Sequence, residues 1–75
     1  MFDPADWETR NTAMVQVLRW FDADHLTGMP YNVAVVIRAT AHEMARELSD
    51  SPELTAGLRK LLEAKDCFVR AAVDA

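Results

Sequence analysis

The stretch LSDSPE, Leu48–Glu53, decides the fold of this 75-residue chain. On both sides of it, apolar residues recur at steps of three and four, which is the spacing of one helical face. Ser51 can cap the second of the two helices, and the proline and glutamate that follow suit its first turn. A link of three residues between two long helices makes them antiparallel neighbours. The sequence therefore predicts a helical hairpin of residues 30–48 and 52–73.

A leading helix is expected before the hairpin. Asp3 can cap it, with Pro4 at its first position, and Gly28 marks the connector that follows it. We expect this helix to span residues 4–22. It carries apolar residues on more than one face, as a helix packed between two neighbours does: Trp7, Met14, Val15, Leu18, Trp20 and Phe21. The sequence thus predicts one all-α domain over residues 1–75.

A chain of this length is expected to need help to be stable, because such a domain buries only about 60% of the surface that its unfolded form exposes. The single cysteine, Cys67, excludes an internal disulfide. His42-Glu43 opens an HExxH-like motif, but Arg46 stands where the second histidine would be, so we expect no metal site. Self-association is therefore the expected source of extra stability, and we predict a homo-oligomer.

Charge and composition argue against several classes of function. A net charge of −4 argues against binding to duplex nucleic acid, which depends on many Lys and Arg contacts with phosphates. The longest apolar run, residues 33–37, is too short to cross a membrane. The acidic N-terminus does not resemble a signal peptide, so we expect a cytoplasmic protein. His25 has no orienting partner in the sequence and Cys67 no neighbouring base, so we expect neither an enzyme nor a cofactor.

Lys65 lies near the middle of the apolar stripe of the last helix, where a charge is unexpected. Its amine could snorkel to water, form an ion pair across an oligomer interface, or meet a phosphate at the rim of an apolar pocket. Arg70, on the polar side of the same helix, could pair with Asp66 or grip phosphate oxygens with its guanidinium. Both residues are candidates for an anion site.

Two further features of the helices invite interpretation. Arg38, His42 and Arg46 form a basic row at steps of four, which we interpret as solvent-facing, with binding of an anion or acidic partner as the alternative. Gly57 lies inside the last helix, where glycine costs about 1 kcal/mol relative to alanine. We expect a close helix crossing there to compensate.

The last helix resembles a known family. The stretch PELT at residues 52–55, followed by GLRKLLEAKDCFVRAA at 57–72, resembles the C-terminal half of the phage-encoded anti-CBASS and anti-Thoeris cyclic-nucleotide sponges. Upstream, LRWFDADHL and AHEMARELSDSPE are similar to the rest of that group, so the resemblance covers residues 17–73. It implies a helical hairpin assembled into homo-hexamers in the host cytoplasm. Such proteins sequester cyclic di- or trinucleotide immune signals without degrading them, and thereby inhibit bacterial anti-phage defence.

The resemblance also implies a ligand site between protomers, with bases on aromatic side chains and phosphates on Lys and Arg. Arg70 matches the arginine in the last helix of the family. No residue aligns securely with the phosphate-binding lysine and stacking tyrosine of the family, so Arg19 and Trp20 enter as candidates by their chemistry, together with Lys65. The alternative function is a phage protein that binds a host protein through a helix-groove interface. A DNA-binding helix-turn-helix is disfavoured by the tight link and the negative charge.

Overall fold

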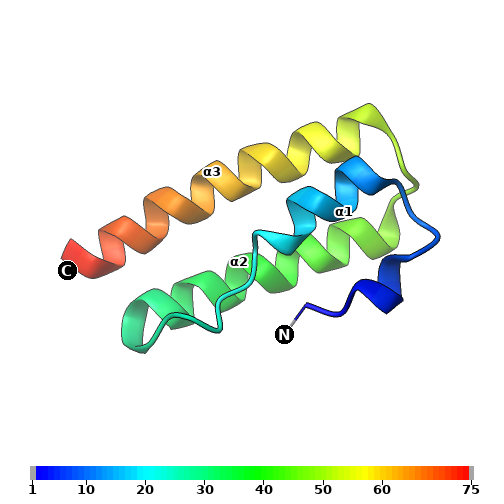
Figure 1. Ribbon diagram of the computed structural model, residues 1–75. Coiled ribbons are helices and arrows are strands. Elements are labelled where there is room, and N and C mark those ends of the chain that lie inside the picture. The colour runs from blue at the N-terminus through cyan, green and yellow to red at the C-terminus, as the bar shows by residue number, and fades with distance from the viewer. Residues whose placement is uncertain (1, 75) are drawn as a thin grey trace.

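The computed structural model describes residues 2–74. Within that range the chain forms a short 3-10 helix and three α-helices: η1 (Pro4–Trp7), α1 (Thr12–Arg19), α2 (Gly28–Glu47) and α3 (Pro52–Asp74). No strand occurs in residues 2–74, so the all-α prediction is confirmed. The two long helices, α2 and α3, lie side by side and run in opposite directions, and α1 lies against one side of this pair (Figure 1).

The core forms where α1 meets the α2–α3 pair. The apolar side predicted for the leading segment is buried, and small α2 residues allow it to approach closely. Its buried members are Trp7, Met14, Val17, Leu18 and Phe21 from the leading segment, Ala41 and Ala45 from α2, and Leu54 and Leu58 from α3. Because this cluster draws on the leading segment and both long helices, it fixes α1 on one face of the pair and leaves the other face uncovered.

The predicted leading helix over residues 4–22 is wrong as a single element. It divides into η1 and α1, and the chain between them turns at residues 8–11. Asn11 starts the second helix, since its side-chain oxygen accepts a hydrogen bond from the Met14 N–H at 3.1 Å. The helix ends at Arg19, and residues 22–27 form the connector to α2. The cap at Asn11 thus overrides the apolar periodicity that suggested one continuous helix.

Arg10 sits at this break and closes the far end of α2. Its Nη1 donates to the Ala45 carbonyl at 2.8 Å and its Nη2 to the Leu48 carbonyl at 2.9 Å. Its Nε also pairs with Asp50 at 2.9 Å, and the other oxygen of that carboxylate accepts from the Asn11 N–H. A cation at a helix C-terminus complements the dipole and satisfies carbonyls that lack partners within the helix. Arg10 therefore ties the N-terminal segment to the turn between the long helices.

The turn between α2 and α3 follows its predicted chemistry. The Ser51 hydroxyl accepts a hydrogen bond from the Leu54 N–H at 3.1 Å, so the serine caps α3 as expected. At the other end of α2, the helix begins at Gly28, two residues before the predicted start, where a φ of 66° suits glycine. Its C-terminal residue is Glu47, one before the predicted end, and α3 runs one residue beyond its own predicted end.

Two expectations about the long helices are wrong. The apolar stripe predicted for α2 is not one buried face: Ala41 and Ala45 are buried, whereas Val36, Met44 and Leu48 are exposed. The close helix crossing expected at Gly57 does not occur within the chain, because nothing lies within 4 Å of the position that a Cβ would take. Part of the apolar surface of α2 is therefore not covered by the described residues. The unfavourable free energy of a glycine inside α3 is likewise not offset by a close contact within residues 2–74.

Candidate functional site

The amine of Lys65 is held inside the protein. Only 7% of this residue is exposed, and its Nζ donates to the Trp20 carbonyl at 2.9 Å. That carbonyl belongs to the C-cap of α1, where helix carbonyls lack partners and the dipole attracts a cation. The interpretation that Lys65 snorkels to water is therefore wrong. Its hydrogen bond to the Trp20 carbonyl anchors the end of α1 on α3. An ammonium group has three N–H donors, so two remain for other acceptors.

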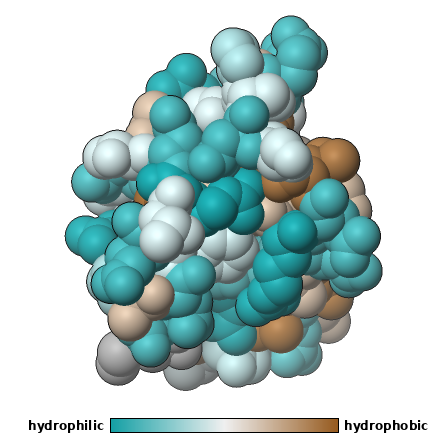
Figure 2. Space-filling model, turned by 90° about the vertical axis from the view of Figure 1, so that its right-hand side faces the viewer, coloured by the Kyte–Doolittle hydropathy of each residue, from teal (hydrophilic) through white to brown (hydrophobic). Residues whose placement is uncertain are grey.

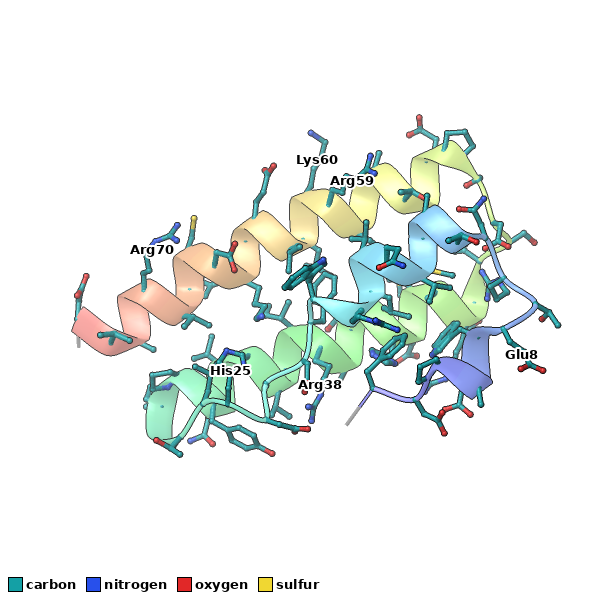
Figure 3. The ribbon with its side chains drawn as sticks, viewed as in Figure 1. Glu8, His25, Arg38, Arg59, Lys60 and Arg70 are labelled. Carbon is teal, nitrogen blue, oxygen red and sulfur yellow. The ribbon has the colours of Figure 1, made fainter. Side chains whose placement is uncertain are left out.

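Lys65 and Arg70, two of the predicted site residues, share one hollow. It has a volume of about 180 Å³ and lies between α3 and the connector that precedes α2. His25 lines it from the connector, with Asp66 and Val69 beside the two cationic residues on α3. In Figure 3, Arg70 projects from α3 near the end of the molecule that carries the C-terminus, on the side of α3 away from His25, which lies on the connector. We call this group, Lys65, Arg70 and His25, the α3-end cluster.

Arg70, like His25, is an exposed member of the α3-end cluster. Its Nη2 approaches the Cys67 sulfur at 3.5 Å, a weak contact that leaves most of its guanidinium donors facing solvent. The cluster therefore combines a buried amine, an exposed planar cation and an imidazole at one rim. Groups of this kind donate to phosphate oxygens, and the guanidinium can do so through two parallel hydrogen bonds.

Arg19 and Trp20, the other two candidates, point to different places. The indole of Trp20 is 68% exposed, although its carbonyl is bound to Lys65. It is therefore an exposed aromatic surface on the residue whose carbonyl binds Lys65. The guanidinium carbon of Arg19 lies 5.5 Å from the centre of the Phe2 ring, and Phe2 lines another hollow. The structure thus brings together Lys65, Arg70 and the backbone of Trp20 but not Arg19.

The basic row of α2 borders the second hollow, which has a volume of about 600 Å³. Arg38 and His42 are half-buried in it rather than solvent-facing, whereas Arg46 is exposed. Arg38 Nη1 lies 3.8 Å from Asp22 and 3.5 Å from Asp24, too far for a hydrogen bond to either carboxylate. The carboxylates of the connector therefore partly neutralise the charge of Arg38. The same ion pairs hold the connector against α2.

His42 is a half-buried titratable group in the lining of this second hollow. Burial lowers its pKa, and the nearby charges of Arg46 and Arg38 lower it further. Its ring meets those of Trp7 and Phe2 edge-on, with centroids 5.7 and 6.1 Å away. The neutral imidazole thus packs as an aromatic ring that fixes the N-terminal segment. These contacts give the row a structural role.

The connector between the two hollows is held in its turn by the carboxylate of Asp22, which accepts hydrogen bonds from the backbone of the connector. Burial acts to raise the pKa of Asp22, but donation from the backbone N–H groups of Asp24 and Ala23 outweighs it, and the pKa is lowered. The Asp24 N–H lies 3.2 Å from the Asp22 carboxylate. This turn positions His25 beside α3, which sequence reasoning missed because a histidine in a turn carries no signal of its distant neighbours.

Residues 2–74 contain no group of three or more His, Cys, Asp and Glu side chains arranged to hold a metal ion. Across the same residues, no helix has the length and apolar character required to span a membrane. Comparison of the chain with protein-family models, curated proteins and solved structures finds no match.

Proposed function

We propose that this protein is a phage-encoded sponge that binds cyclic di- or trinucleotide immune signals in the host cytoplasm without degrading them, and so inhibits bacterial anti-phage defence. The observation that carries the proposal is the α3-end cluster, in which Lys65 and Arg70 line one hollow. The proposal is further supported by the resemblance of residues 17–73 to the sponge family. In this account Arg70 and Lys65 bind phosphate, and the exposed indole of Trp20 offers a stacking surface for a base.

The chemistry of these groups suits a cyclic oligonucleotide. Stacking of one base on an aromatic side chain contributes about 1 to 3 kcal/mol. Charge-assisted hydrogen bonds from guanidinium or ammonium groups to phosphate are about twice as strong as neutral ones. A chain with a net charge of −4 can still bind an anion at a hollow lined by cationic side chains, because the field is set locally.

The hollow is too small to enclose such a ligand within one chain. Its volume is about 180 Å³. Sites that enclose small molecules have volumes of roughly 300 to 1,000 Å³. A second protomer would complete the site and bury the ligand between subunits, which fits the expected homo-oligomer. We retain the hexamer implied by the resemblance as the assembly to be tested.

The test is the Arg70→Glu variant in a titration with a panel of cyclic di- and trinucleotides. When the free nucleotide concentration is 100 times the dissociation constant, the parent protein should gain about 2.7 kcal/mol of stability, which is read as an upward thermal shift. Arg70→Glu should abolish that shift and leave assembly intact, since residue 70 is exposed. Arg59→Glu is the matched control, because it reverses an exposed arginine on the same helix about 16 Å away.

Two results would contradict the proposal: no shift of the parent protein with any member of a broad panel, or unchanged affinity in Arg70→Glu. Recovery of a hydrolysed nucleotide would contradict the sponge mechanism in particular.

The second candidate is a small phage protein that modulates a host protein through a helix-groove interface. The observation in its favour is the set of large apolar side chains exposed on the long helices, among them Val36 and Phe68. Native mass measurement separates the two candidates. A monomer that associates only with a host protein favours this second function, whereas a ligand-binding homo-oligomer favours the sponge.

A further inference from the structure

One face of the α2–α3 pair has no covering element. α1 lies against the opposite face (Figure 1), and Figure 2, which looks at the end of the molecule where α2 turns into α3, shows several apolar residues towards its right-hand side. Three exposed members are large: Met29 and Val36 on α2 are 58% and 63% exposed, and Phe68 on α3 is 53% exposed. Isolated exposed apolar residues are ordinary, but a continuous set on one face marks an interaction surface. We call it the uncovered face.

Apart from Phe68, the two helices contribute side chains of opposite size to the uncovered face. Along α2, Met29 and Val36 are seven residues apart, so they lie on one line of the helix. Along α3, Gly57, Ala64 and Ala71 repeat at the same interval. Because the helices run antiparallel from one turn, Ala71 and Ala64 lie at about the heights of Met29 and Val36. At these two heights, a large side chain on α2 therefore stands level with a small one on α3.

Gly57 is an independent indication that another helix packs closely against this face. Glycine inside a helix is unfavourable relative to alanine, and it is usually offset by a close backbone contact. Here nothing lies within 4 Å of the position of a Cβ, so residues 2–74 make no such contact. A second helix laid along α3 would make it.

We infer that the uncovered face binds a second copy of this chain, with α2 of each copy packed on α3 of the other about a twofold axis parallel to the long helices. That arrangement seats Met29 and Val36 of one copy over Ala71 and Ala64 of its partner, and the twofold axis repeats the contact. An isologous interface of this kind requires one surface to complement itself, and the large and small lines on the two helices provide that complementarity.

The charges on the uncovered face fit the same arrangement. Glu43 continues the line of Met29 and Val36 by a further seven residues, and it lies at about the height of Gly57. Lys60 follows Gly57 by almost one turn on α3, and both charged residues are exposed. In the twofold arrangement Glu43 of one copy approaches Lys60 of the other, and the axis generates the pair twice. Opposite charges of the two copies are thus adjacent at the end of the face nearer the turn between α2 and α3.

The area available is sufficient for a stable dimer. The molecule measures 39 × 23 × 17 Å along its principal axes. The uncovered face follows α2 for about 30 Å and spans two helices, about 20 Å across. That outline approaches the roughly 800 Å² that each partner contributes to a standard interface. The dimer would also supply the stabilisation that a chain of this length lacks.

The experiment is sedimentation velocity on the full chain without nucleotide, over a concentration series, with two matched valine variants. Val36→Glu places a charge in the centre of the face, twice per dimer, and should weaken self-association at least about a hundredfold. Val73→Glu makes the same change at a valine that is equally exposed, 68% against 63%, but lies outside the face, and it should keep the parent mass. Gly57→Ala should weaken association as well, because the partner helix would meet the added methyl.

A monomeric parent at 100 µM overturns the proposal and leaves the face to a partner of different sequence. An unchanged mass of Val36→Glu overturns it also, as does a Gly57→Ala protein that is more stable and equally associated. The inference does not rest on nucleotide binding: an assembled protein that binds no nucleotide sinks the proposed function alone, and a nucleotide-binding monomer sinks the dimer alone.

Discussion

Replacing Arg10 by methionine should cost this protein more stability than any other change to a single surface charge. The guanidinium makes two hydrogen bonds to carbonyls at the end of α2, at 2.8 and 2.9 Å, and an ion pair with Asp50 at 2.9 Å. Hydrogen bonds from a charged donor contribute about 1.5 kcal/mol or less each where water has access, and the ion pair adds about 0.5 kcal/mol. The sum is about 2 to 3 kcal/mol in the free energy of unfolding.

The assay is thermal unfolding followed by far-ultraviolet circular dichroism, at one fixed protein concentration because assembly shifts the midpoint. For a domain of this length, a loss of 1 kcal/mol lowers the midpoint by about 4 to 8 °C, so Arg10→Met should unfold about 10 to 20 °C below the parent. Arg10→Lys should fall between the two, since an ammonium keeps the charge but cannot reach three acceptors in a plane. Arg59→Met, at an exposed site, should stay within about 0.5 kcal/mol.

An Arg10→Met protein that unfolds within 2 °C of the parent would refute this reasoning. It would mean that water satisfies the α2 carbonyls as well as Arg10 does, and that the N-terminal segment is not fixed by this residue.

Two further predictions follow from the buried cation and the buried imidazole. Lys65→Met should lower stability by about 1 kcal/mol, because it leaves the Trp20 carbonyl unpaired, while Arg59→Met again serves as the exposed control; a stabilised Lys65→Met protein would show that its amine does not anchor α1. The lowered pKa of His42 means that the unfolded chain binds the proton more readily, so stability is full above the unfolded value of about 6.5 and falls as the pH drops below it. Urea unfolding from pH 8 to 5 should show this slope, and His42→Gln should flatten it; an equal slope in both proteins would contradict the assignment.

The features predicted correctly from sequence are those set by short-range chemistry. Apolar residues at helical spacing predict both long helices, and the Ser51 cap is visible because it acts three residues along the chain. The division of the leading segment at residues 8–11 was not foreseen. The cap at Asn11 competes there with a continuous apolar pattern, and Arg10 settles the outcome through contacts with residues 35 to 40 positions away.

The candidate site was predicted only in part for the same reason. Lys65 and Arg70 could be paired from sequence because both lie on α3, but the partner of the Lys65 amine is 45 residues away. His25 joins them through the fold of the connector, which a sequence pattern does not encode locally. Arg19 was chosen for its chemistry next to Trp20, yet neighbours in a helix point in different directions, and its guanidinium lies over Phe2 instead.

The uncovered face explains why the apolar pattern of α2 predicted a broader buried surface than the chain contains. Val36 and Met44 belong to the periodic stripe, but no intramolecular element covers them. A pattern of burial read from sequence does not distinguish the core of one chain from an interface between copies.

Native mass spectrometry of the protein mixed with an equimolar panel of cyclic di- and trinucleotides tests the central claim most directly, since one spectrum reports subunit number and bound mass. The account predicts an assembly of even subunit number that retains at least one nucleotide of unaltered mass, and the loss of that nucleotide, with the assembly intact, in Arg70→Glu. A single 8.4 kDa chain with no nucleotide bound at micromolar concentration would contradict it.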